Sequence, residues 1–300
     1  MMMQTKNKDE GQGMRDKRNA FAFFGTPELA VEILDELEGA GYVPSLVVTM
    51  PDRARGRGMA LRETPVGAWA KKRGIEALKP EKLDDAFVAE VAKRDLQFAI
   101  VVAYGKIMPK SLLEILVMYN IHYSLLPRWR GATPVEAAIL AGDVETGVVI
   151  QKIVHELDAG PIVAVEKTEI GADETGVALR SRLNYIAKKL LVRILPEILA
   201  GNMKLVEQDK TRATFCGKIS KEDGLLDFSD GGELNYRKFR AYFGWPGVCT
   251  FFERSGKRIR TIIVKAHKDG AQFVIDIVKP EGKGEMPYED FVRSGAKVAR

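Results

Sequence analysis

Short apolar runs alternate with amphipathic stretches through the first two thirds of the chain. Residues 21–24 (FAFF), 45–50 (SLVVTM) and 98–103 (FAIVVA) are almost continuously apolar, which is typical of strands buried on both faces of a sheet. Between such runs, leucine and isoleucine recur at helical spacing, first in residues 29–37. This alternation of strand and helix predicts an α/β fold with a doubly wound, mostly parallel sheet.

The same two patterns continue as far as residue 199. They predict strands at residues 75–78, 119–122, 148–154 and 162–169, and helices at residues 65–73, 84–93, 111–116, 134–140 and 174–199. We therefore expect residues 20–200 to form one domain.

After residue 200 the pattern changes. Residues 201–214 have the character of a linker, and short strands between turns are predicted beyond it. These strands are expected at residues 225–228, 248–252, 259–264 and 273–278, with a helix at residues 235–242. We expect residues 215–300 to form a small C-terminal β-barrel domain of the OB-like kind.

Composition places the chain among globular proteins. The 300 residues are 46% hydrophobic and 29% charged, and no apolar run approaches the roughly 20 residues that a membrane span requires. Residues 1–19 are polar and lack the apolar core of a secretory signal, so we expect a disordered tail, with Met14 an alternative start. Two distant cysteines, Cys216 and Cys249, fit a reduced cytoplasmic setting.

Basic residues are in excess near the C-terminus. Residues 206–300 hold 18 Lys and Arg against 14 Asp and Glu, whereas residues 1–205 hold 28 against 27. This distribution fits a module that faces nucleic acid, although a solvated surface would have a similar composition.

An arginine-rich segment follows the second predicted strand. Residues 51–62 (PDRARGRGMALR) carry Arg53, Arg55 and Arg57 among two glycines, without hydrophobic periodicity. Open α/β sheets bind ligands at the carboxyl ends of their strands, so we interpret this segment as a flexible loop that grips phosphates. A solvated charged loop is the alternative. The glycine turn before the first helix (GTPELA) lacks the GxGxxG pattern, so NAD is not expected.

The most distinctive chemistry lies in residues 119–158. Asn120 and His122 are two positions apart, so on a strand their side chains leave the same face and could stabilise an oxyanion. The string SLLPRWRG follows at residues 124–131, and Asp158 precedes a glycine turn, where aspartate is also common for local reasons. The three histidines show no metal-ligand spacing, so no metal is expected.

Taken together, these segments resemble the folate-dependent formyltransferases and, among them, the methionyl-tRNA formyltransferases. The resemblance covers residues 20 to about 296. It rests on FFGTPELA, PDRARGRG, NIHYSLLPRWRGATP, ETGVVIQKIVHELDAGPI, and KISKEDGLLDF with a later WPG. Tyr123 departs from the pattern, because the family usually has glycine after the histidine, and this affects the shape of the following loop.

The resemblance implies transfer of the formyl group of 10-formyltetrahydrofolate to the amino group of methionine on initiator methionyl-tRNA. Asn120 and His122 would stabilise the oxyanion of the tetrahedral intermediate. Asp158 would orient His122, favour its protonated form and help to move the amine's proton, directly or through water.

The resemblance also implies which residues bind the substrates. The folate site would be lined by Ser124, Leu125, Leu126 and Pro127, with the backbone near Tyr104 and Gly105 available to the pterin. Arg53, Arg55 and Arg57 would contact tRNA, and Arg57 matches the family arginine that engages the acceptor end. We expect no metal, no membrane association and a monomer.

Two other functions remain open from the sequence. The same core could formylate an amino sugar linked to a nucleotide, or the chain could be a non-catalytic tRNA-binding protein. Two side chains in the central segment have no assigned catalytic role: His155 is expected in a surface turn, and Trp129 could be a hydrophobic plug or a stacking platform.

Overall fold

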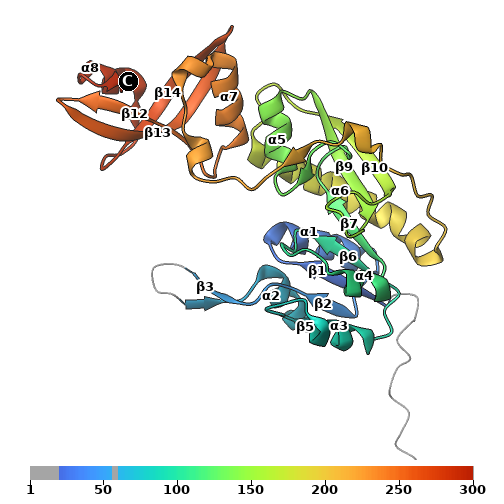
Figure 1. The fold of residues 1–300 in the computed structure, drawn as a ribbon. Helices are drawn as coiled ribbons and strands as arrows, with labels where there is room; N and C mark the ends of the chain where they lie inside the picture. The colour runs from blue at the N-terminus through green and yellow to red at the C-terminus, as the bar shows by residue number, and fades with distance from the viewer. Residues whose placement is uncertain (1–19, 56–59, 300) are drawn as a thin grey trace, which may run out of the picture.

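The computed structural model describes residues 20–55 and 60–299 of the chain (Figure 1). A seven-stranded sheet in the order β10-β9-β7-β6-β1-β2-β5 organises the first two thirds. The five strands from β5 to β7 run parallel, whereas β9 and β10 are antiparallel to their neighbours, which confirms the mostly parallel sheet. These strands are β1 (Phe21–Gly25), β2 (Leu46–Val48), β5 (Glu76–Leu78), β6 (Phe98–Val102), β7 (Met118–His122), β9 (Glu145–Lys152) and β10 (Ile162–Glu169).

Helices cover both faces of this sheet. Alternate side chains along β1 serve the two layers: Phe21 and Phe23 pack against one set of helices, and Ala22 and Phe24 against the other. The first layer contains α1 (Glu28–Gly39), α2 (Pro65–Lys72), α5 (Pro134–Ala141) and α6 (Gly176–Ala200); the second contains α3 (Asp85–Ala92) and α4 (Lys110–Ile115). The predicted helices of this part of the chain are confirmed.

The register of β7 decides which side chains meet at the site. Tyr119 and Ile121 belong to the layer of α1 and α6, whereas Met118 packs against the layer of α3 and α4. Asn120 and His122 therefore point to the same side as Met118, which confirms that they share a face. The antiparallel neighbour β9 places Gln151 directly opposite Asn120.

The arginine-rich segment is more regular at its ends than the sequence predicts. β3 (Arg53–Arg55) and β4 (Ala60–Arg62) pair as an antiparallel hairpin, so the expectation of a loop without regular structure is wrong there. Its base is fixed by Asp52, whose carboxylate accepts hydrogen bonds from Lys79 Nζ at 3.0 and 2.8 Å. The Lys79 hydrogen bond lowers the pKa of the Asp52 carboxyl, so the base stays paired at neutral pH.

The last third contains a five-stranded antiparallel sheet in the order β15-β14-β13-β12-β16. Within the described residues the outer strands β15 and β16 do not pair, so closure into an OB-like barrel is not confirmed. The elements are α7 (Gly232–Ala241), β12 (Val248–Arg254), β13 (Lys257–Asp269), β14 (Gln272–Pro280), β15 (Met286–Pro287), α8 (Tyr288–Arg293) and β16 (Lys297–Val298). Across both parts of the described chain, no helix combines the length and apolarity needed to span a membrane.

The strand predicted at residues 225–228 is not present. The segment instead runs between two 3-10 turns, Glu222–Gly224 and Phe228–Asp230, and Leu225 alone forms an isolated bridge, with Cys249. The reason is local competition for the backbone: the Asp227 side chain accepts from the Ser229 amide at 2.8 Å, and Asn235 Nδ2 donates to the Asp227 carbonyl.

The segment that follows α6 packs closely against the α/β part. Val206 forms a bridge with Ile162 at the start of β10. Farther on, β11 (Phe215–Cys216) pairs in parallel with β8 (Arg130–Gly131), which belongs to the string SLLPRWRG. The two short strands thus join segments more than 80 residues apart in the chain.

Tyr123, which stands where glycine is usual, is part of the core. Its hydroxyl donates to Asn184 Oδ1 at 2.8 Å, and Asn184 Nδ2 in turn donates to Glu32 Oε2 at 2.7 Å. Burial raises the pKa of the Tyr123 phenol, so the hydroxyl keeps its proton. The side chain therefore ties the end of β7 to α6 and α1 instead of entering the loop beside Ser124.

This arrangement predicts the effect of Tyr123→Phe on stability. Removing the hydroxyl leaves the buried Asn184 Oδ1 without its donor, so the free energy of unfolding should fall by about 1–2 kcal/mol. Urea unfolding of wild type and variant measures the difference. Tyr185→Phe is the control, because Tyr185 is 57% exposed and should lose little. Equal losses in the two variants would contradict the bridging role of Tyr123.

Candidate active site

Asn120 and His122 stand at the carboxyl end of β7, at the edge of the sheet where α/β folds bind ligands. Asn120 is half-buried and, with Gln151 and Asp158, lines a cavity of about 130 Å³. In the described part of the chain its side-chain amide forms no hydrogen bond, so both amide protons are available to a group in the cavity.

His122 is only 5% exposed and is held from both sides of its ring. Nε2 lies 2.9 Å from the Trp129 carbonyl oxygen, and because a carbonyl only accepts, this nitrogen carries the proton. Nδ1 lies 3.8 Å from Asp158 Oδ2. The Asp158 carboxylate therefore faces the ring nitrogen that does not bond to Trp129.

Trp129 has a structural role in this arrangement. Its backbone adopts a positive φ of 61°, which turns its carbonyl toward His122. The indole Nε1 donates to Asp143 Oδ2 at 2.7 Å, and the Arg128 guanidinium lies 4.4 Å from the ring centroid. These partners anchor the indole. The backbone carbonyl of Trp129 fixes the tautomer of His122.

Asp158 is fixed at three points. Its Oδ2 accepts from the Gly131 amide at 2.8 Å, and its Oδ1 accepts from Gln151 Nε2 at 2.8 Å. Its backbone adopts a positive φ of 48°, and the turn packs so closely on β9 that a Cβ at Gly160 would lie 1.7 Å from the Lys152 carbonyl oxygen. The carboxylate is therefore pre-positioned beside His122 and the cavity.

The residues predicted to line the folate site occupy two different environments. Tyr104 is buried at the end of β6, and its hydroxyl has no hydrogen-bond partner in the described residues; Gly105 is exposed with a φ of 90°. Both precede Lys106 and Met108, which line the cavity of Asn120.

The predicted folate residues at positions 124–127 lie in the turn after β7. Ser124 is fully buried and donates from Oγ to the Arg128 carbonyl at 2.6 Å. Leu125 approaches Gly147 of β9, Leu126 is buried, and the bond to Pro127 is cis. None of these four lines the 130 Å³ cavity, so the structure brings Asn120, His122 and Asp158 together and leaves this turn beside them.

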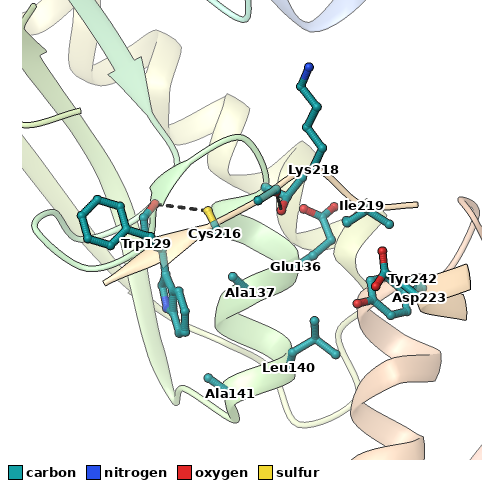
Figure 2. Close-up of a pocket in the computed structure, with 13 residues that line it drawn as sticks. Trp129, Glu136, Ala137, Leu140, Ala141, Cys216, Lys218, Ile219, Asp223 and Tyr242 are labelled. Carbon is teal, nitrogen blue, oxygen red and sulfur yellow. Dashed lines mark hydrogen bonds between the residues drawn. The ribbon is translucent and has the colours of Figure 1, made fainter. Parts of the chain in front are cut away.

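A second cavity of about 430 Å³ is lined by other residues (Figure 2). It is lined by Trp129 and by residues of α5, of the segment around β11, and of the C-terminal part of the chain, including Tyr242. Cys216 faces it and its thiol lies 3.5 Å from the Trp129 carbonyl. Burial raises the pKa of this thiol, so Cys216 is protonated at neutral pH and is not a thiolate nucleophile.

The sequence analysis did not identify two glutamines that contact Asp158. Gln151 and Gln208 both belong to its hydrogen-bond network. A signal existed for Gln151, because it is a polar residue within an apolar strand and needs a buried partner. Gln208 lies in the predicted linker and had no comparable signal.

The remaining candidates are the three arginines and His155. Arg53 is exposed on the hairpin, the Arg55 side chain lies outside the described portion, and Arg57 lies outside the described residues. His155 is exposed at the rim of the first cavity, as expected for a surface turn. In residues 20–55 and 60–299, no group of three His, Cys, Asp or Glu side chains could hold a metal ion.

Comparison with known sequences gives consistent matches. The family profile described as Formyl transferase matches residues 17–195. The methionyl-tRNA formyltransferase of Anaeromyxobacter dehalogenans is 39% identical over 265 residues, covering 87% of this chain and 82% of that protein. A protein of the same name from Thermus thermophilus is also 39% identical, with 87% and 85% covered.

Solved structures agree on the fold. A sugar N-formyltransferase from a Shewanella species superposes with a TM-score of 0.63 at 16% identity, covering 87% of this chain and 99% of that one. HypX from Aquifex aeolicus gives 0.61 at 14% identity, covering 91% of this chain and 46% of that one. At these identities the likeness concerns the fold alone. On the strength of the sequence matches, the chain belongs to the formyl transferase family, among the methionyl-tRNA formyltransferases.

Proposed function

We propose that this enzyme transfers the formyl group of 10-formyltetrahydrofolate to the amino group of methionine on initiator methionyl-tRNA. The observation that carries the proposal is the juxtaposition of Asn120, His122 and Asp158. An unpaired amide and a fixed carboxylate face one cavity, and an imidazole lies 3.8 Å from that carboxylate. The 39% identity to proteins named methionyl-tRNA formyltransferase supports the choice of acceptor.

Asn120 is the proposed oxyanion donor. The amine attacks the formyl carbon, and negative charge develops on the formyl oxygen. The side-chain amide of Asn120 lies at the cavity wall without a competing partner among the described residues, so its N–H can be directed at that oxygen. A donor that is already oriented stabilises the developing charge without reorganisation.

Asp158 and His122 are proposed to handle the proton. Attack leaves the amine nitrogen with a proton to lose, and Asp158, held by Gly131 and Gln151, accepts it directly or through water. When the oxyanion re-forms the carbonyl, the bond between the formyl carbon and the folate nitrogen breaks, and that nitrogen takes the proton and leaves as tetrahydrofolate. The Nε2 proton of His122 is occupied by the Trp129 carbonyl. The ring therefore acts through Nδ1, which faces Asp158 at 3.8 Å, and is proposed to orient that carboxylate and support the oxyanion.

The cavity also fits a pterin-bearing co-substrate. It offers apolar walls from Met108 and Ile153 beside the polar groups of Asn120 and Gln151, the combination that small-molecule sites use. Tyr104 does not line this cavity, and its backbone remains a proposed contact of the pterin. Gly105 and residues 124–127 remain the proposed further contacts.

The tRNA would be held outside this cavity. Arg53 and Arg55 belong to β3 of a hairpin that extends from the sheet (Figure 1). Arg57 lies outside the described residues and stays a proposed tRNA contact on sequence grounds, and residues 206–300 carry the basic excess. We propose that residues 20–200 catalyse and that residues 215–300, as an OB-like module, face the RNA. A cytoplasmic monomer is the state proposed for the enzyme.

The first prediction concerns the oxyanion donor. Asn120→Ala should lower kcat roughly a hundredfold or more while the protein stays folded, because one such donor is worth that much. Single-turnover formylation of methionyl-tRNA, with circular dichroism as the folding check, measures the effect. Asn202→Ala is the control, because Asn202 is exposed after α6.

Two results would contradict the assignment. Near-wild-type kcat in a folded Asn120→Ala protein would remove Asn120 from the mechanism. Formylation by wild type of an amino-sugar nucleotide, but not of methionyl-tRNA, would move the chain's activity to the other acceptor.

The second prediction concerns the arginine-rich segment, residues 51–62. Arg57→Ala should impair formylation of methionyl-tRNA while leaving folate affinity unchanged, and Arg57→Lys should also be poor if the guanidinium makes a bidentate contact. Loss of one phosphate contact should reduce the slope of log affinity against log salt by about one. Formylation rates across a salt series, with folate affinity measured separately, test this.

Arg193→Ala is the matched control, because Arg193 is an exposed arginine on α6 and should leave the salt dependence unchanged. Equal losses of folate and tRNA binding in Arg57→Ala would indicate a folding defect. No loss of either would show that the segment is only a solvated charged loop.

A further inference from the structure

Gln208 is buried at the meeting point of three segments. It lies in the stretch after α6, is 8% exposed, and touches the turn that carries Asp158. Its Nε2 donates to the Asp158 carbonyl at 2.9 Å and to the Gly160 carbonyl at 2.7 Å, and it lies 3.3 Å from Gln151 Oε1. The side-chain amide of Gln208 thus binds the backbone of the turn at Asp158. It also contacts Gln151, whose own amide binds the Asp158 carboxylate.

The amide oxygen of Gln208 accepts hydrogen bonds from the buried guanidinium of Arg130. Arg130 is 1% exposed, and its Nε and Nη2 donate to Gln208 Oε1 at 3.2 and 2.8 Å. Its Nη1 donates to Glu156 Oε1 at 3.1 Å, in the same turn as Asp158. A guanidinium removed from water must keep its partners, so this network resists rearrangement.

Glutamine suits this position because it provides a donor and an acceptor in one planar group. Two backbone carbonyls require the N–H groups, and the guanidinium requires the oxygen. Glutamate would keep the contact to Arg130 but place a carboxylate against the two carbonyl oxygens. Methionine would keep the volume but provide neither group.

We propose that Gln208 is a positioning residue, through which the segment after α6 holds Asp158 in its reactive place. The inference rests on the proposed function, because it assigns Asp158 to proton transfer. Gln208 lines neither cavity and so acts through Asp158 and Gln151. Its loss displaces the carboxylate without removing any group that contacts substrate.

The kinetic test compares Gln208→Glu and Gln208→Met with wild type in formylation of methionyl-tRNA by 10-formyltetrahydrofolate. Both variants should lower kcat about tenfold to a hundredfold, because small displacements of a catalytic group cost that much. KM for each substrate should change less than about threefold, because the groups that bind the substrates are unchanged. Glu207→Gln is the control, because Glu207 is the exposed neighbour and should keep wild-type kcat.

A double-mutant cycle separates positioning from general destabilisation. If Gln208 acts through Asp158, adding Gln208→Glu to Asp158→Asn should lower kcat by less than about twofold further. A merely structural residue would lower kcat by the same factor in both backgrounds. Multiplicative losses would therefore overturn the proposal.

A measurement independent of activity is provided by hydrogen exchange. The Gly131 amide donates to Asp158 Oδ2, so its protection reports whether the carboxylate is in place. Exchange at Gly131 should rise at least about tenfold in both Gln208 variants, while the Ala99 amide, bonded to the Val117 carbonyl in the sheet, stays protected. Unchanged Gly131 protection, or unchanged kcat in either folded variant, would overturn the proposal.

The two proposals fail in distinguishable ways. A wild-type protein that formylates neither methionyl-tRNA nor an amino-sugar nucleotide would overturn the proposed function before any variant is compared. The exchange of Gly131 would still decide whether Gln208 holds Asp158. If Gln208→Glu is too unstable to purify, Gln208→Met carries the same comparisons, because it introduces no buried charge.

Discussion

The buried guanidinium of Arg130 constrains the centre of this molecule. A charge that is 1% exposed loses its hydration and must recover that free energy from fixed partners. Those partners are Gln208, in the segment after α6, and Glu156, in the turn before Asp158. Because the loss of either partner would leave a buried guanidinium with fewer hydrogen bonds, these contacts tie together the turn, the segment and the string SLLPRWRG.

The polar groups of the site are held in two ways, by strands of the sheet and by a strained turn. Asn120 and Gln151 are opposed across two strands of the central sheet, where register fixes their separation. Asp158 stands instead in a turn with a positive φ and a glycine pressed against β9. Such conformations persist only where surrounding contacts over-determine them, which explains why so many hydrogen bonds converge on this turn. The sheet sets the position of the amide, and the network sets the position of the carboxylate.

Sequence reasoning succeeded where local pattern and global fold agree. The apolar runs identified the parallel strands, and the spacing of Asn120 and His122 predicted their common face, because side-chain alternation is a local property. It failed where the pattern is weak or the partners are distant in sequence. The β3–β4 hairpin pairs short strands without a marked apolar alternation, and residues 225–228 are turned by Asp227 and Asn235. The role of Gln208 depends on contacts with residues 50 and 78 positions away.

These distant contacts give the segment after α6 a second role besides connection. Beyond Gln208 the chain enters β11, which pairs with β8, the strand that contains Arg130. From there it lines the 430 Å³ cavity and continues to the antiparallel sheet that carries much of the basic excess. The segment therefore links the basic part of the chain to the turn of Asp158 through its own hydrogen bonds, in addition to the direct hydrogen bonds that α7 makes with the α/β part.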